Sequence, residues 1–292
     1  MGEPTVMFCT GATKAGTSWL HAYLAGHPEC HFRSIKELHY FDALDEGRLD
    51  RRAAQIAAAR DALADKRAAA PMFKRRKLAA RIADHDAYLS VLERGAEDRD
   101  AYLGYLCDRR GRARVVGDVT PAYGLLSAER LAAMARMASD VRFVYLLRDP
   151  VDRLWSHVRM MAARRSDNGK VDPARAANIL KRTISGEETQ IVRRSDYQGA
   201  LETLFAAVPQ ARRLVAFYED LFTGDAVARI CAHLGISAQP APVDAVVHGG
   251  QPLEMTGEQR RAARDWLAPQ YDFVTATLGD VPARWQTDLA KV

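Results

Sequence analysis

The first residues with chemical potential form a glycine-rich turn near the start of the chain, Gly11-Ala12-Thr13-Lys14-Ala15-Gly16-Thr17-Ser18. The turn follows an apolar run typical of a buried strand and precedes a stretch typical of a helix. Free N–H groups of such a loop and the dipole of the following helix point at one spot, so the turn predicts a phosphate-type anion site. The ATP- and GTP-binding version places a lysine directly after the second glycine. Here that place holds Thr17, and the lysine lies inside the loop at Lys14.

A second set of polar residues follows the apolar run at 141–147. Arg148 comes at the end of this predicted strand, and a proline two residues later favours the first turn of a helix that would carry Ser156. A guanidinium and a hydroxyl so placed could share one phosphate. An ion pair of Arg148 with Asp149 or Asp152 is the competing interpretation.

A third segment places charged residues beside aromatic ones, in the order Lys36-Glu37-Leu38-His39-Tyr40-Phe41-Asp42. Such a composition suits a substrate cleft in which a carboxylate accepts a proton. A polar loop anchored by its aromatic rings would show the same composition.

The elements that must position these residues alternate along the chain. Apolar runs predict strands at Val6–Cys9, Val115–Val119, Val141–Leu147 and Leu214–Tyr218. Helical patterns lie at 17–26, 127–138, 151–165, 197–207 and 219–234. The alternation predicts an α/β fold with a central parallel sheet flanked by helices. Ligands bind such sheets at the carboxyl ends of the strands, which is where the loops at 11–18 and 148–156 would lie.

Residues 43–110 interrupt the alternation and predict a helical insertion after the first βα unit. The expected helices span 47–69 and 72–94, and the insertion could stand over the strand ends as a cap. Residues 51–81 carry ten Lys and Arg against two Asp. This excess could attract anionic ligands or could be the solvated side of the helices.

Two further segments complete the chain. Residues 166–195 form a second polar, partly helical segment. A capping box from Thr256 to Gln259 predicts a helix that runs toward Leu278.

Composition sets the broad class. The chain has 292 residues, of which 48% are hydrophobic and 27% charged, with a net charge of +5, as expected for a globular protein. We expect one domain over 1–292, because the insertion is embedded in it. No apolar stretch is long enough for a membrane span and no leader precedes the first strand. The four cysteines include no C-x-x-C pair, so we expect a cytoplasmic protein without a metal site.

Taken together, the three motifs resemble those of the sulfotransferases that use 3′-phosphoadenosine 5′-phosphosulfate (PAPS), including the carbohydrate-type and bacterial members. The family signature K-x-G-T-[ST] is matched by Lys14, Gly16, Thr17 and Ser18. Its R-[DN]-P strand end with a following helical serine is matched by Arg148, Asp149, Pro150 and Ser156. Its K-E-x-x-[FY]-F segment is matched by Lys36, Glu37, Tyr40 and Phe41. The resemblance spans about 5–42 and 115–236 and implies a P-loop-like fold.

The resemblance implies roles for the donor-binding residues. The 5′-phosphosulfate would be bound by Lys14, Ala15, Gly16, Thr17 and Ser18. Lys14 would also neutralise the charge that builds on the bridging oxygen as the S–O bond breaks. Arg148 and Ser156 would hold the 3′-phosphate, which distinguishes this donor from ATP. Trp19 stands where some relatives place an aromatic ring against the adenine, and core packing of the first helix explains it equally well.

The resemblance also implies a general base. In carbohydrate-type relatives a glutamate in a setting similar to that of Glu37 removes the acceptor's proton, whereas other relatives use a histidine, which makes His39 the competitor. An ion pair of Glu37 with Lys36 or Lys14 is the non-catalytic alternative. Val119 stands where some relatives have a second lysine, so that group is absent here.

The sequence therefore predicts transfer of a sulfuryl group from PAPS to a hydroxyl, less readily an amine, of a small-molecule, carbohydrate or lipid acceptor, with release of adenosine 3′,5′-bisphosphate (PAP). No metal and no nucleic acid would take part. A phosphotransferase using ATP is the alternative, against which the displaced lysine argues. A nucleic-acid-binding module at 51–81 is a second alternative, although Phe73 is the only aromatic residue there for stacking. The insertion and residues 166–195 would set the acceptor, which the sequence does not name.

Overall fold

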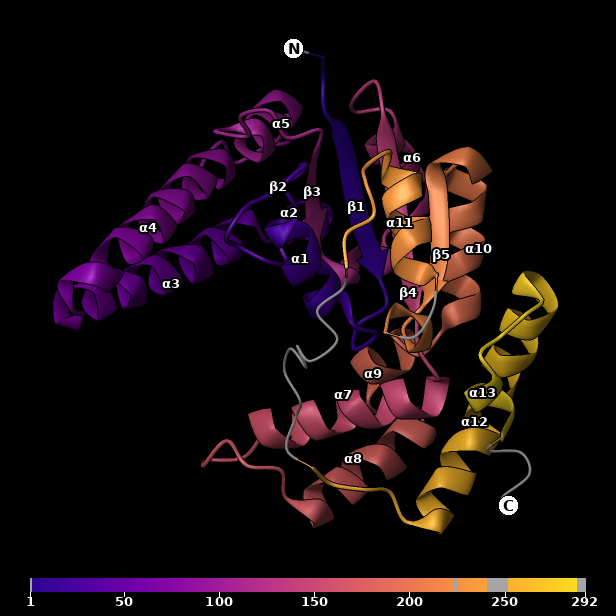
Figure 1. Cartoon of the computed structure of the whole chain (residues 1–292). Helices are drawn as coiled ribbons and strands as arrows, with labels where there is room; N and C mark the ends of the chain where they lie inside the picture. The colour runs from indigo at the N-terminus through magenta and orange to yellow at the C-terminus, as the bar shows by residue number, and fades with distance from the viewer. Residues whose placement is uncertain (1, 223–224, 241–251, 288–292) are drawn as a thin grey trace.

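The computed structural model describes residues 2–222, 225–240 and 252–287, and its centre is a parallel sheet of five strands (Figure 1). The spatial order is β2-β3-β1-β4-β5. The strands are β1 (Thr5–Gly11), β2 (Cys30–Phe32), β3 (Val115–Val119), β4 (Val141–Leu147) and β5 (Arg213–Phe217). The predicted α/β class and its four predicted strands are confirmed. The additional strand, β2, is three residues long and half-buried at the sheet edge, so no apolar run marks it.

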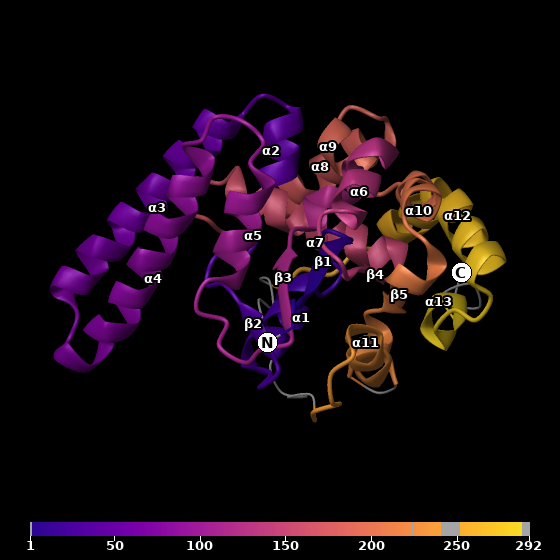
Figure 2. The same cartoon turned by 90° about the horizontal axis from the view of Figure 1, so that it is seen from above.

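Helices cover both faces of the sheet. Figure 2 shows α1 and α11 on one face and α5, α6 and α10 on the other, while α7, α8 and α9 lie below the carboxyl ends of the strands in Figure 1. The helices of the main body are α1 (Thr17–Gly26), α2 (Tyr40–Asp45), α5 (Arg99–Cys107), α6 (Ala128–Ala135), α7 (Pro150–Arg164), α8 (Pro173–Ile184), α9 (Thr189–Arg193), α10 (Tyr197–Ala207), α11 (Ala226–Leu234), α12 (Gly257–Leu278) and α13 (Ala283–Thr287). None of the helices in the described ranges has the apolar length that a membrane crossing requires.

Most helix predictions agree with the structure, and one is wrong. The capping box that begins α12 is present, with Thr256 and Gln259 each bonded to the other's main chain. The continuous helix expected over 219–234 is instead a 3₁₀ turn at Glu219–Leu221 followed by α11. The Glu219 carboxylate accepts the N–H of Asp149 at 2.8 Å, so this turn is tied to the loop after β4.

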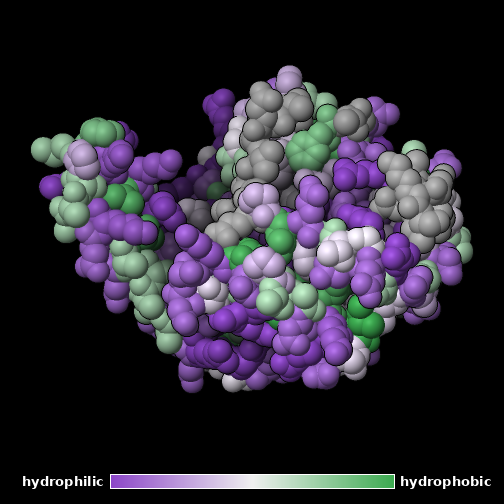
Figure 3. Space-filling view, turned by 90° about the horizontal axis from the view of Figure 1, so that it is seen from below, coloured by the Kyte–Doolittle hydropathy of each residue, from purple (hydrophilic) through white to green (hydrophobic). Residues whose placement is uncertain are grey.

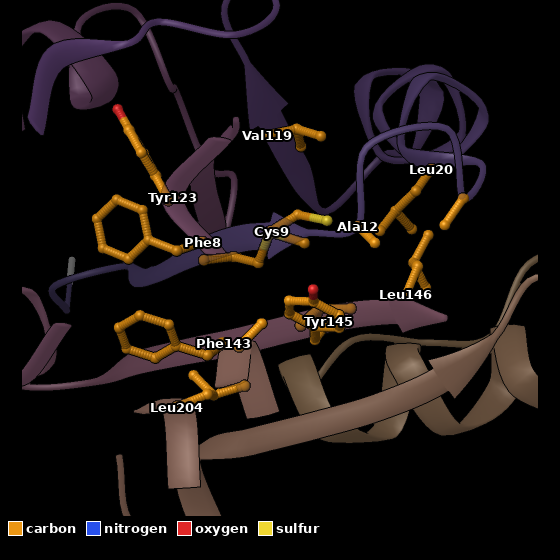
Figure 4. Close-up of a cluster of buried hydrophobic side chains, with 14 of the residues drawn as sticks. Phe8, Cys9, Ala12, Leu20, Val119, Tyr123, Phe143, Tyr145, Leu146 and Leu204 are labelled. Atoms are coloured by element: carbon orange, nitrogen blue, oxygen red, sulfur yellow. The ribbon is translucent and has the colours of Figure 1, made fainter. Parts of the chain in front are cut away.

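The core explains why β1 and β4 read as nearly unbroken apolar runs. Central strands of a parallel sheet are covered on both faces, so neither face can be polar. Phe8 of β1 and Phe143 of β4 are fully buried, and their ring centroids lie 5.6 Å apart (Figure 4). The register pairs Phe8 with Phe143 directly, and it brings the carboxyl ends of the two strands together.

The predicted insertion contains a hairpin of two long helices, α3 (Leu49–Ala69) and α4 (Met72–Leu92). The hairpin projects beyond the β2 edge of the sheet (Figures 1 and 2), so its outer part does not cap the strand ends. Only its base is anchored. Asp84 of α4 contacts Arg33 at 2.6 Å, both side chains being 8% exposed, and its other oxygen accepts the N–H of Ser34 at 2.7 Å. The Arg33 guanidinium also lies 4.5 Å above the Tyr105 ring.

We expect Asp84→Ala to lower the free energy of unfolding by about 3 kcal/mol, because removing one partner of a buried ion pair leaves the other charge uncompensated. The urea midpoint measures the change. Asp86→Ala, on the exposed side of the same helix, is the matched control, and its loss should be within about 0.5 kcal/mol. Equal losses in the two variants would contradict the anchoring role of Asp84.

Candidate active site

The glycine-rich turn joins the end of β1 to the start of α1, and its two glycines permit close packing. Gly16 has φ 88°, and a Cβ there would lie 2.5 Å from the Tyr218 ring. A Cβ on Gly11 would lie 2.1 Å from the Tyr145 ring. Lys14 itself has a positive φ of 72°. Larger residues at the glycines would push the turn away from the rings that support it.

The turn presents donors to an incoming anion. In the part of the chain that the structure describes, the N–H groups of Lys14, Gly16, Thr17 and Ser18 have no acceptor. The N–H of Ala15 is used internally, by the Ala12 carbonyl at 3.1 Å. Since α1 begins at Thr17, its positive dipole end adds to these donors. The geometry is that of an anion cradle, with Ala15 contributing shape rather than a donor.

Positive side chains gather around this turn. Burial lowers the pKa of Lys14, and the charges of Arg148, Arg159 and Arg164 lower it further. Arg159 and Arg164 come from α7 and were missed in the sequence analysis. Arg159 is three residues after Ser156, so helical spacing on that segment was the available signal. Several cations crowded together in one half-buried site favour a ligand with more than one negative charge.

Among the described residues Arg148 makes neither of the two ion pairs considered as its alternative role. Its guanidinium carbon lies 4.7 Å above the Tyr218 ring, and Nη1 donates to the Lys14 carbonyl at 3.3 Å. Asp149 instead accepts the Tyr271 hydroxyl at 2.8 Å, and Asp152 pairs with Arg260 and Arg284.

Ser156 and Trp19 differ in how accessible their side chains are to a ligand. Ser156 is half-buried on α7, and its hydroxyl has no hydrogen-bond partner within residues 2–222, 225–240 and 252–287. Trp19 is 4% exposed and stacks on Tyr23 with ring centroids 5.5 Å apart, while the Phe222 ring meets it edge-on. The structure therefore shows Trp19 in its core-packing role.

Hydrogen bonds from the two long helices of the insertion hold the segment that contains Glu37 and His39. Both residues have left-handed backbones, with φ of 63° and 55°. Arg52 of α3 and Tyr88 of α4 donate to the Leu38 carbonyl at 2.9 and 2.8 Å. The two helices of the insertion thus fix the backbone between Glu37 and His39, a contact that sequence patterns do not reveal.

A buried carboxylate lies beneath the same segment. Asp118, at the end of β3, is 2% exposed and accepts the hydroxyls of Tyr102, Thr120 and Tyr123 at 2.6–2.8 Å. Burial raises its pKa, and these hydrogen bonds partly offset that rise. The Tyr123 hydroxyl also accepts the N–H of Tyr40 at 3.0 Å, which connects the network to the segment above.

Two charged side chains contact Glu37, whose own side chain is 42% exposed. Lys36 forms an ion pair with one carboxylate oxygen, and His39 Nε2 lies 3.6 Å from the other. Nδ1 of His39 contacts Asp42 at 2.7 Å. Burial alone would raise the pKa of Glu37, but His39 and Lys36 outweigh it and lower the value to about 2. Burial would lower the pKa of His39, but its contacts with Asp42 and Glu37 raise the value to about 9.

A cleft of about 1000 Å³ opens beside His39. The insertion forms one wall and α9 with its following residue forms another, so both segments expected to set the acceptor contribute. Its lining includes six arginines: Arg48, Arg51, Arg52, Arg130, Arg193 and Arg194. Arg130 pairs with Asp45 and Glu97, and Arg48 with Glu46.

Four arginines of this cleft form no ion pair among the described residues: Arg51, Arg52, Arg193 and Arg194. Arg52 donates instead to the main-chain carbonyls of Leu38 and Glu37. Arg194 is half-buried and donates hydrogen bonds to Gln190, and its pKa is lowered by burial and by the charge of Arg193. The charges of Asp42 and Glu37 act in the opposite direction on Arg194, which places it near the predicted base. The cleft therefore holds positive charge that the protein itself does not neutralise.

The chain resembles solved bacterial proteins over nearly its whole length. A sulfotransferase from Alicyclobacillus acidocaldarius superposes with a TM-score of 0.64 at 20% identity, covering 98% of this chain and all of the other. The sulfotransferase domain of the olefin synthase from Synechococcus PCC 7002 superposes with a TM-score of 0.55 at 19% identity, covering 96% of each chain. At these identities the likeness concerns the fold.

Sequence comparison gives the assignment. No curated protein matches this chain. The model of the sulfotransferase family, however, matches residues 5–240, which include the glycine-rich turn, the segment of Glu37 and the strand end of Arg148. The protein is an α/β enzyme that belongs to the sulfotransferase family.

Proposed function

We propose that the enzyme transfers the sulfuryl group of PAPS to an acceptor hydroxyl and releases PAP. The observation that carries the proposal is the position of Arg148, which bridges the Lys14 carbonyl and the Tyr218 ring and has no carboxylate partner among the described residues. A guanidinium fixed in this way beside the anion cradle suits a second phosphate on the same ligand. Ser156 would add a hydroxyl donor to that phosphate.

The donor supplies an activated sulfuryl group on a phosphate leaving group. Lys14 and the N–H groups of Gly16, Thr17 and Ser18 would bind the phosphosulfate. As the acceptor oxygen bonds to sulfur and the bridging S–O bond breaks, negative charge moves onto the departing phosphate. Lys14 is positioned to neutralise it, and preorganised positive charge of this kind is a principal source of transition-state stabilisation.

Glu37 is the better candidate for the base. His39, with a pKa near 9, carries its proton at neutral pH and has no lone pair to accept another. Its charge instead fixes the Glu37 carboxylate between Lys36 and itself. A carboxylate with a pKa near 2 is a weak base, so proton transfer requires Lys36 to be drawn away from it. The anionic donor offers Lys36 that alternative partner.

The arginine-lined cleft is the proposed acceptor site, and it favours an acceptor that carries a carboxylate, phosphate or sulfate besides its hydroxyl. Arg51 and Arg194 approach from different elements and lack carboxylate partners among the described residues, so an acceptor anion would pair with them. The hydroxyl would then lie toward His39 and Glu37.

The donor assignment is tested by calorimetry with PAP, ADP and Mg-ATP. We expect tight binding of PAP and weaker binding of ADP. Lys14→Ala and Arg148→Ala should each weaken PAP binding about ten- to a hundredfold, as expected for loss of a charge-assisted contact. Arg175→Ala, an exposed arginine of α8, is the matched control and should leave the affinity unchanged. Tighter binding of Mg-ATP than of PAP, or an unchanged PAP affinity in Arg148→Ala, would contradict the assignment of Arg148 to the 3′-phosphate.

The protonation of His39 is measurable by NMR titration of its ring. We expect a midpoint near pH 9, and a lower midpoint in Asp42→Asn, because that variant removes one of the two carboxylates. Since the folded value lies above the ordinary 6.5, the stabilisation from charged His39 is complete below about pH 6.5 and disappears as the pH rises through 9. His39→Gln identifies the resonance among the eight histidines. A titration midpoint at or below pH 6.5 would contradict the protonated state of His39 and make it a candidate for the base again.

Base and acceptor class are tested together by following PAP release from PAPS with a panel of hydroxylated compounds. We expect the compounds with an anionic group to be turned over, with a raised KM in Arg194→Ala. Glu37→Gln should reduce turnover by about 10²- to 10⁴-fold while leaving PAP affinity intact. Glu258→Gln, at the exposed start of α12, is the control. Full activity of Glu37→Gln would exclude Glu37 as the base.

A further inference from the structure

The free end of the hairpin carries two large apolar side chains that are mostly exposed to solvent. Met72 and Phe73, the first two residues of α4, are 82% and 78% exposed, and they are the exposed large apolar side chains of the described residues. Isolated apolar residues on a surface are ordinary, but adjacent ones at the end of a projecting element are not. Figure 3 shows apolar and hydrophilic side chains together on this arm.

Positive charge surrounds this apolar tip. Between residues 66 and 81 the chain has no Asp or Glu and seven cations: Lys66, Arg67, Lys74, Arg75, Arg76, Lys77 and Arg81. All seven are exposed. Arg75 is used in part within the hairpin, since it donates to the Ala70 and Ala68 carbonyls and so caps α3. The other six have no carboxylate partner in the part of the chain that the structure describes.

We propose that the tip of the α3–α4 hairpin docks on an anionic lipid surface. Met72 and Phe73 would enter the boundary between headgroups and acyl chains, and the surrounding lysines and arginines would contact the headgroups. Each element of this arrangement has a known physical basis: apolar side chains bury area in the interface, and each Lys or Arg near an anionic leaflet adds attraction.

The shape of the tip favours a lipid surface over other anionic partners. A protein partner is usually held by side chains that enter pockets, whereas these two side chains project from a convex end. Single-stranded nucleic acid would need several aromatic rings for stacking, and Phe73 is the only one in the basic region. A fluid bilayer accepts a convex apolar wedge ringed with cations and requires no further complementarity.

The proposal is independent of the proposed active site, because the tip lies far from the base of the hairpin that lines the acceptor cleft. Arg51 and Arg52 lie at the base of α3 and Met72 lies beyond its far end, so the helix places roughly 27 Å between them at 1.5 Å per residue. Variants at the tip should therefore leave PAP affinity unchanged, and the two proposals can fail separately.

The test is co-sedimentation of the full chain with vesicles of phosphatidylcholine alone or mixed in equal parts with phosphatidylglycerol. We expect binding to the mixed vesicles that weakens as salt is raised. Lys74→Glu/Lys77→Glu should weaken it by at least about tenfold, and Met72→Ser/Phe73→Ser should also reduce it strongly. Lys181→Glu/Arg229→Glu makes the same change of charge on exposed residues of α8 and α11, and it should retain binding.

Insertion of the tip into the bilayer is measured by the tryptophan fluorescence of the Phe73→Trp variant. Its emission should shift to shorter wavelength on the mixed vesicles and be quenched by lipids brominated on the acyl chain. An unchanged urea midpoint in each tip variant shows that the fold is intact. Equal binding to both kinds of vesicle, full binding by Met72→Ser/Phe73→Ser, or association of the chain with itself through the tip would each overturn the proposal.

Discussion

Repulsion among cations at the carboxyl edge of the sheet is the constraint on which the donor site depends. Lys14 and Arg148 are adjacent because β1 and β4 pair in parallel, so that the loops following both strands meet. Arg159 and Arg164 add to the same field, and burial together with these charges lowers the pKa of Lys14. The fold retains the arrangement because core packing of the two strands is far stronger than this repulsion. A ligand with several negative charges removes the cost, and binding and stability are therefore coupled at this edge.

The insertion serves the predicted base through its anchored end. Asp84 fixes Arg33 and Ser34, while Tyr88 and Arg52 hold the Leu38 carbonyl. These contacts bracket the segment that leads into Glu37 and His39, whose left-handed backbones require outside support. The base of the insertion thus supports the segment of the proposed base, whereas its tip is a separate, exposed surface.

The features that the sequence predicts depend on residues close together in the chain, whereas the features that it misses depend on contacts between distant residues. The glycine-rich turn, the strand end at Arg148 and the capping box of α12 depend on neighbours a few residues away, and local patterns were sufficient for them. The hydrogen bond from Tyr88 to Leu38 joins residues 50 positions apart, and the Asp118 network connects a strand with two other elements. Contacts of this kind have no periodicity. The sequence analysis did not predict the short strand β2 for a related reason, since β2 forms by pairing with β3 rather than because of its apolar content.

The two halves of the site therefore differ in how they recognise ligands. The donor half uses main-chain donors and a short motif, which suit one invariant group. The proposed acceptor half draws arginines from α3 and from the end of α9, segments that lie outside the motifs shared with the sulfotransferases. These arginines also influence the base, because Arg194 and Glu37 interact electrostatically. An acceptor anion paired with Arg194 would bring a like charge near the Glu37 carboxylate, which raises the pKa of a carboxyl group. Acceptor binding would thereby make Glu37, the proposed base, more basic, which links the proposed recognition of the acceptor to its activation.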